Sequence, residues 1–191
     1  MLSAPELRSA RLLLRGWRQA DRAPFAALNA DSRVMEHFPA CMTREESDTL
    51  IDWIMAGFHQ RGWGLWAVEV AATGEFIGFT GLSVPSFEAR FTPAVEVGWR
   101  LARTAWGHGY ATEAAQAALG VGFGQASLAE IVSFTAVANV RSQAVMRRIG
   151  MTHDPADDFD HPRLASVDRL RRHVLYRIPA DRWRHREQGI A

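Results

Sequence analysis

The sequence is poor in cysteine and in net charge. Cys41 is the single cysteine among 191 residues, which excludes an intramolecular disulfide framework and a zinc site built from cysteines alone. No feature around Cys41 indicates an activated thiol. The 22 basic and 21 acidic side chains leave a net charge of +1. The composition therefore gives no reason to expect a nucleic-acid partner.

Long apolar runs are also missing. The N-terminal segment has only three consecutive leucines, Leu12–Leu14, between arginines, too few for the apolar core of a signal peptide. No run approaches the length that crosses a bilayer. We therefore expect a cytoplasmic protein without a membrane partner. Its length suits one domain over residues 1–191, with a core from about residue 11 to residue 183.

Apolar periodicity predicts an α/β (α+β) domain, with a mixed sheet covered by helices. A capping box at Thr43–Glu46 opens one helix, Asn139 caps another and Gly150 stops it. The expected strands are 11–17, 65–70, 76–82, 95–101, 130–137 and 172–178, and the expected helices are 21–30, 44–60, 111–123 and 140–149. Loops are expected at 83–93 and 154–166, and a basic tail from residue 181 that is mobile at its end.

Residues 95–118 are the most informative stretch, because a strand, a glycine-containing turn and an Ala-rich helix follow one another there. Gly107 and Gly109 carry no Cβ, so the backbone can approach an anionic group closely. The following helix supplies free N–H groups and the positive end of its dipole. The turn therefore predicts a phosphate or pyrophosphate site, and Arg103 and His108 flank it as possible phosphate contacts.

Two other phosphate-binding motifs fit this turn less well. A P-loop requires Gly-Lys-Ser/Thr, and no lysine lies nearby. A dinucleotide site would use Gly107, Gly109 and an acid such as Glu130, 21 residues after Gly109. Thr112, however, replaces the third glycine, and Glu130 starts a strand where the ribose-binding acid should end one. A nicotinamide-dependent enzyme remains the weaker alternative.

Five segments in order carry a family resemblance: RLLLRGWRQAD, GEFIGFTGL, VEVGWRL, WGHGYATEA and ANVRSQAVMRRIGM. Together they resemble the Gcn5-related N-acetyltransferase (GNAT) family, and in detail its RimJ/RimL branch, over about residues 11–183. Gly109-Tyr110-Ala111 is similar to the end of the family signature Gln/Arg-x-x-Gly-x-Gly/Ala. Trp106 stands where the family usually has Gln or Arg, so the amides of residues 107–112 must form the phosphate cradle.

The resemblance implies a mostly antiparallel sheet, with the acyl-CoA turn between the fourth strand and the third main helix. It implies acetyl-CoA as co-substrate, no metal, and direct acetyl transfer to a primary amine of a protein N-terminus or a small molecule. A homodimer is possible, since this branch often pairs. The implied cofactor contacts are Val97, Trp99, Arg103, Gly107, His108, Gly109, Tyr110, Ala111, Thr112 and Asn139.

Glu96 is the candidate general base. It lies between Val95 and Val97 in a strand, so its side chain points to the opposite side from theirs, either into a cleft or into solvent. The RimL-like pattern has a glutamate here, which favours the catalytic role over a solvated strand face. By the same resemblance, the amide of Val97 or of its neighbour would polarise the thioester carbonyl.

Ser142 is the candidate acid for the thiolate leaving group. Many family members use a tyrosine seven residues after the asparagine that corresponds to Asn139, and here that position holds Met146. Ser142 lies on the first turn of the same helix and is a substitute. Asn139 can act as helix N-cap and, by the resemblance, also touch the pantetheine arm. The missing tyrosine leaves open a non-catalytic acetyl-CoA-binding sensor or scaffold.

Candidates for the acceptor side come from loops and aromatic residues. Acidic Asp158 and Asp160 would suit a cationic amine, although a capped loop motif explains them nearly as well. No His/Asp/Glu cluster has metal-ligand spacing. The residues expected to wall the amine are His37, Phe38, Trp63, Trp66, Phe87, Asp160 and His161.

Overall fold

The computed structural model describes residues 4–188. Its sheet has the strand order β1-β2-β3-β4-β5-β6-β9-β7, with β8 also paired to β9. The strands are β1 (Leu7–Arg8), β2 (Leu12–Arg15), β3 (Leu65–Val70), β4 (Glu75–Ser83), β5 (Glu96–Leu101), β6 (Glu130–Ala136), β7 (Thr152–His153), β8 (Phe159–Asp160) and β9 (Arg172–Pro179). All the pairs are antiparallel except β5 with β6.

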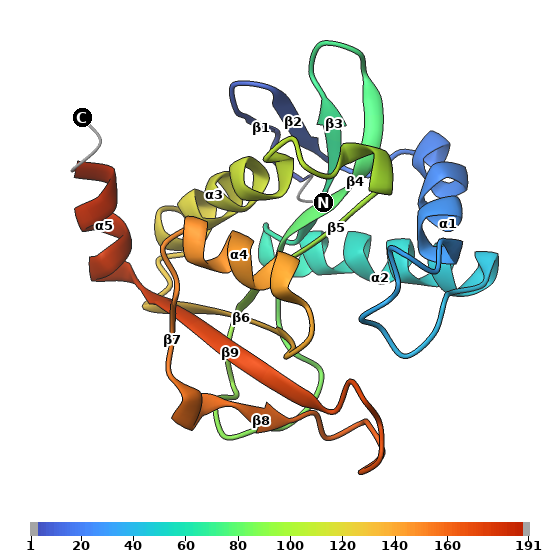
Figure 1. Ribbon diagram of the computed structural model, residues 1–191. Coiled ribbons are helices and arrows are strands. Elements are labelled where there is room, and N and C mark those ends of the chain that lie inside the picture. The colour runs from blue at the N-terminus through green and yellow to red at the C-terminus, as the bar shows by residue number, and fades with distance from the viewer. Residues whose placement is uncertain (1–3, 189–191) are drawn as a thin grey trace.

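The helices cover this sheet as the sequence predicted (Figure 1). They are α1 (Arg22–Ala30), α2 (Arg44–Arg61), α3 (Tyr110–Phe123), α4 (Val140–Arg148) and α5 (Ala180–Gln188), with 3-10 turns at Gln19–Asp21, Arg103–Ala105 and Pro155–Asp157. Thr43 and Glu46 form the predicted reciprocal capping box of α2. None of the helices described within residues 4–188 is long and apolar enough to cross a membrane.

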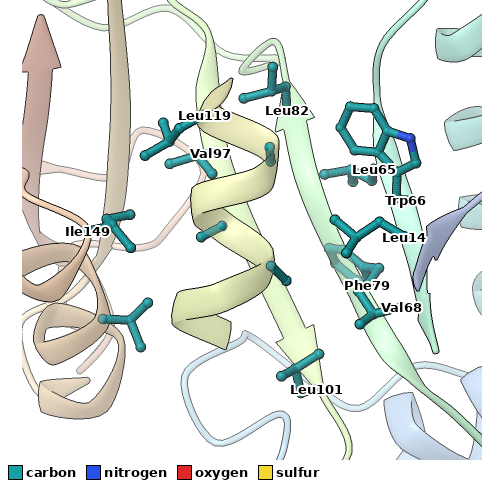
Figure 2. Packing of buried hydrophobic residues seen from close by; sticks show 14 of the residues in the cluster. Leu14, Leu65, Trp66, Val68, Phe79, Leu82, Val97, Leu101, Leu119 and Ile149 are labelled. Atoms are coloured by element: carbon teal, nitrogen blue, oxygen red, sulfur yellow. The ribbon is translucent and has the colours of Figure 1, made fainter. Parts of the chain in front are cut away.

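The main core lies between α3 and the middle of the sheet. Ala114, Ala115 and Ala118 are fully buried, which confirms that the alanine stripe allows close helix-to-sheet packing. Val97 of β5 lies next to Leu119 of α3 in Figure 2, and both are fully buried. Val97 therefore fixes which side of β5 faces α3, and the residues before and after it face the other side.

Helix α1 packs on that other side of the sheet. Phe25 of α1 contacts Phe79 of β4 edge-on, with ring centroids 5.8 Å apart. Phe79 is paired across the strands with Arg100 of β5. The side of β5 that carries Glu96, Gly98 and Arg100 therefore faces α1 and the segment that follows it.

The end of the chain differs from the prediction, because residues 180–188 form α5 where no helix was predicted. The expected mobile end of the tail lies outside the described residues. Trp183 is its apolar anchor and stacks on Phe123 of α3, with ring centroids 5.8 Å apart. Arg182 Nε donates to the carbonyl of Gly150 at 2.9 Å. The short strands β7 and β8 also lie in segments where no strand was predicted.

Candidate active site

Strands β5 and β6 separate and leave a notch in the sheet. Within residues 4–188 they share one residue pair, Glu96 with Val132, and the Val132 amide donates to the carbonyl of Val95 at 2.9 Å. Backbone groups alternate between the two edges of a strand. The N–H and C=O of Trp99 therefore face the notch, whereas the amide of Val97 faces the paired part of β6.

The indole of Trp106 closes the far end of this edge. Its Nε1 donates to the carbonyl of Leu101 at 2.9 Å. Trp99 thus retains one donor and one acceptor along the open edge of β5, which suits an amide-containing ligand that lies along the strand.

The glycine turn (residues 106–109) joins this edge to α3. Gly107 and Gly109 have φ values of 82° and 80°, a conformation that side chains with a Cβ rarely adopt. A Cβ at Gly107 would meet no atom within 4 Å, so the backbone there borders open space. Gly109 is the N-cap of α3, and the first-turn amides lack intrahelical partners. This geometry fits an anionic group.

Cationic side chains surround the glycine turn. The guanidinium of Arg141 lies over the ring of Trp106, with Cζ 4.7 Å from its centroid. Arg141 is also exposed to solvent. Arg103 is 63% exposed, with Nε 3.8 Å from Asp31. His108 stacks on Tyr110, with ring centroids 5.3 Å apart.

Arg11 is a further cation at the turn that the sequence did not indicate. Its Cζ lies 4.9 Å from the ring centroid of Tyr110, and its Nη2 lies 2.7 Å from a carboxylate oxygen of Glu113 in the first turn of α3. Both contacts join parts of the chain that are far apart in sequence, so no local sequence pattern predicts them.

Glu96 lies where the notch begins. A Cβ at Gly98 would come 3.7 Å from Oε1 of Glu96, so the carboxylate leans over Gly98. Burial raises the pKa of Glu96 to about 8, against a hydrogen bond from Ser83 that lowers it. Glu96 is partly buried, and a pKa near 8 suits a general base near neutral pH.

Asn139 is the N-cap of α4, as predicted. Its Oδ1 accepts from the amide of Ser142 at 3.2 Å, and its Nδ2 donates to Oγ of Thr135 at 2.9 Å and of Ser142 at 3.1 Å. The Ser142 oxygen is thus an acceptor, and its own hydroxyl hydrogen has no acceptor within residues 4–188. Met146, at the tyrosine position of the family, is buried.

Trp66 does not line the acceptor side, contrary to expectation. It is fully buried, its ring packs edge-on against Phe58, and its Nε1 donates to the carbonyl of Pro5 at 2.8 Å. The aromatic character of a strand residue does not show whether a helix covers it. Trp63 lies beside Arg61, whose Cζ is 5.1 Å from its ring centroid.

The segment between α1 and α2 lies over the Glu96 side of β5. Phe38 stacks on the guanidinium of Arg100, with Cζ 4.1 Å from the ring centroid. Arg169 Nη2 donates to the carbonyl of Glu36 at 2.7 Å, so the loop before β9 meets this segment. Burial lowers the pKa of His37, and its Nδ1 is enclosed without a hydrogen-bond partner.

Phe87 and His161 lie together beside the same face. Their ring centroids are 4.6 Å apart, and His161 is 5.1 Å from His173 of β9. Burial lowers the pKa of both histidines, so they are uncharged at neutral pH. His173 was not predicted as a site residue, because it lies within the last predicted strand and no local pattern distinguishes it there.

Asp158 and Asp160, the two acidic candidates in the 154–166 loop, form ion pairs or hydrogen bonds with neighbouring side chains. Asp160 pairs with Arg171 at 3.2 Å and with Arg172 at 3.3 Å, and Asp158 lies 2.7 Å from Nε2 of His153. Both carboxylates have partners within the chain, which favours a structural role, although the side chain of Asp160 is 48% exposed. Among the described residues no group of three His, Cys, Asp or Glu side chains is placed to hold a metal.

Comparison with known proteins agrees with this geometry. Residues 11–152 match the family described as Acetyltransferase (GNAT) domain. The chain is 33% identical over 156 residues to the FsC-acetyl coenzyme A-N(2)-transacetylase of Aspergillus fumigatus, an alignment covering 78% of this chain and 66% of that protein.

Solved structures share the fold. An acetyltransferase from Agrobacterium tumefaciens str. C58 superposes with a TM-score of 0.74 at 29% identity, over 93% of this chain and 96% of that one. The ribosomal L7/L12 α-N-protein acetyltransferase RimL, solved with coenzyme A, superposes with a TM-score of 0.72 over 93% and 99% of the chains. At 19% identity that likeness concerns the fold alone. The protein belongs to the GNAT acetyltransferase family.

Proposed function

We propose that the protein transfers an acetyl group from acetyl-CoA to a primary amine by direct attack, with Glu96 as general base. The observation that carries the proposal is the place of Glu96. Its carboxyl group, with a pKa raised to about 8, lies at the residue pair where β5 and β6 begin to separate. A base at this point reaches the end of a ligand that enters the notch from the glycine turn.

The residues around the notch suit coenzyme A. The amides of Gly107 to Thr112, the cations Arg103 and Arg141 and the imidazole of His108 would hold the phosphates. The C=O of Trp99 would accept from an amide of the pantetheine arm, with Val97 behind it and Asn139 across the notch. The name of the Aspergillus relative, an acetyl coenzyme A transacetylase, supports this donor.

The chemistry requires a neutral amine, a base and a proton for the leaving group. The amine nitrogen attacks the thioester carbonyl carbon, a C–N bond forms and the C–S bond breaks. Glu96 takes the proton that the nitrogen loses, directly or through a water molecule. Ser142 gives its hydroxyl proton to the thiolate and regains one from solvent. An amide of β5, by register that of Trp99, would stabilise the oxyanion.

Melting curves with acetyl-CoA, CoA and NADH side by side test the donor. Ligand at a hundred times its dissociation constant stabilises by about 2.7 kcal/mol, which for this size raises the melting temperature by roughly 5–11 °C. We expect the shift with the CoA compounds only. A shift with NADH alone, or no shift, would overturn the proposal.

CoA release with amine acceptors then tests transfer. The chain contains no lysine, so lysine self-acetylation cannot account for released CoA. We expect release that depends on an added amine. Binding of acetyl-CoA without release for any small amine or peptide N-terminus would instead favour the sensor or scaffold that Met146 and Trp106 suggest.

A further inference from the structure

Arg100 is a partly buried cation without a carboxylate partner. Its guanidinium lies between two aromatic rings, with Cζ 4.1 Å from the centroid of Phe38 and 5.5 Å from that of Phe79. None of the ion pairs within residues 4–188 includes Arg100, and burial lowers its pKa to about 10. It remains charged at neutral pH. A buried charge is costly unless it is paired, and no carboxylate is paired with Arg100 to offset this cost.

The hydrogen bonds of Arg100 show where an anion can bind. Nη1 donates to Oδ1 of Asn29 at 2.7 Å and lies 3.5 Å from Sδ of Met42. Nε is enclosed and has no partner. Nη2 makes no hydrogen bond within residues 4–188 either but, unlike Nε, is not enclosed. A guanidinium has five donors, and those of Nη2 remain available to a ligand.

Arg100 shares a strand face with the proposed base. Glu96, Gly98 and Arg100 alternate with buried Val97 and Leu101, so they lie on one side of β5. A Cβ at Gly98 would meet only Oε1 of Glu96 within 4 Å, so the strand surface between the two charged residues is open. This strip has a proton acceptor at one end and an unpaired cation at the other.

Uncharged side chains and a paired carboxylate lie around the strip. The segment carrying Phe38 covers the Arg100 end, and His161 and His173, both uncharged at neutral pH because burial lowers their pKa, lie beside the face. Asp160 is paired with two arginines. An acidic acceptor would supply the negative charge that Arg100 lacks.

We propose that the acceptor carries a carboxylate close to its amine, and that this carboxylate binds Nη2 of Arg100 while the amine faces Glu96. The carboxylate belongs either to a free amino acid or to an acidic side chain of a peptide. This inference rests on the proposed function, because it assigns the acceptor of the same site.

Acceptor pairs that differ in the carboxylate test this, with kcat/KM expressed per unprotonated amine because an α-carboxylate also raises the pKa of the neighbouring amine. CoA release is measured with the standard amino acids against their amides, and with dipeptide amides that carry Asp against Asn in second position. We expect the wild-type enzyme to favour the carboxylate-bearing member of one set by about 10- to 100-fold in kcat/KM, the effect of one charge-assisted contact. The set that shows the preference identifies the source.

The Arg100→Gln variant should lower kcat/KM for the acid much more than for the matched amide, and so abolish that preference. Arg100→Lys should restore part of it. Arg44→Gln is the control, since Arg44 pairs with Asp48 on the exposed surface of α2, and it should keep the full preference. The wild-type preference needs no variant and remains a test if Arg100→Gln does not fold.

Equal rates for acid and amide, transfer to neither, or a preference that survives in Arg100→Gln would overturn the inference. These outcomes differ from failure of the proposed function, in which acetyl-CoA would not raise the melting temperature of the wild-type protein at all.

Discussion

The guanidinium of Arg141 in α4 lies 4.7 Å from the ring centroid of Trp106 in the glycine turn. The contact places a positive charge beside residue 106, where the family usually has Gln or Arg. A tryptophan at position 106 therefore does not leave the turn without a charged donor, because Arg141 of α4 supplies one from across the notch.

Arg141→Ala should raise the dissociation constant of acetyl-CoA about tenfold, the effect of about 1.4 kcal/mol from a charge-assisted contact at a partly exposed site. Isothermal titration gives the constant. Arg148→Ala, an exposed arginine on the same helix, is the matched control and should bind normally. Equal affinity of both variants would remove Arg141 from the phosphate site.

Gly107→Ala should destabilise the protein by about 1–2 kcal/mol, because a side chain is forced into the left-handed region, and should also weaken acetyl-CoA binding. Gly120→Ala is the control, since its Cβ meets nothing within 4 Å and it lies inside α3. That change should stabilise by roughly 0.5–1 kcal/mol. Urea unfolding distinguishes the two, and normal acetyl-CoA affinity of Gly107→Ala would contradict the cradle.

Ser142→Ala should lower kcat and leave the acetyl-CoA dissociation constant unchanged, because the thiolate loses a proton donor that acts only during the reaction. General acids contribute about 100-fold or more. Ser142→Thr keeps a hydroxyl group and should retain most of the rate. Stopped-flow measurement of CoA release shows the difference. Unchanged kcat in Ser142→Ala would mean that a water molecule supplies the proton.

Glu96→Gln should stabilise the protein at alkaline pH. The folded protein keeps the Glu96 proton up to about pH 8, whereas the unfolded chain loses it around 4.5. Between these values the folded state binds more protons, so the free energy of unfolding falls as pH rises. The advantage of Glu96→Gln should grow by about 1.4 kcal/mol per pH unit in this window and vanish below it. A pH-independent difference in urea unfolding would contradict the raised pKa.

Local patterns in the sequence predicted the glycine turn, the caps of α2 and α4 and the strand that carries Glu96, because each depends on residues within a few positions. The contacts of Arg141 with Trp106 and of Arg11 with Tyr110 join distant segments and have no local signal. Arg100 could have been predicted as a site residue, since it lies four residues after Glu96 in the same strand and therefore on the same face of the sheet. Helix α5 was missed because Trp183 is nearly its only apolar residue.

The rate of acetyl transfer by wild type and by Glu96→Gln across pH tests the central claim most directly. With one acceptor the ionisation of the amine cancels in the ratio of kcat/KM values. The ratio should rise tenfold per pH unit below the Glu96 pKa of about 8 and level off above it, at about 100-fold or more. A ratio near one at every pH would contradict the assignment of Glu96 as general base.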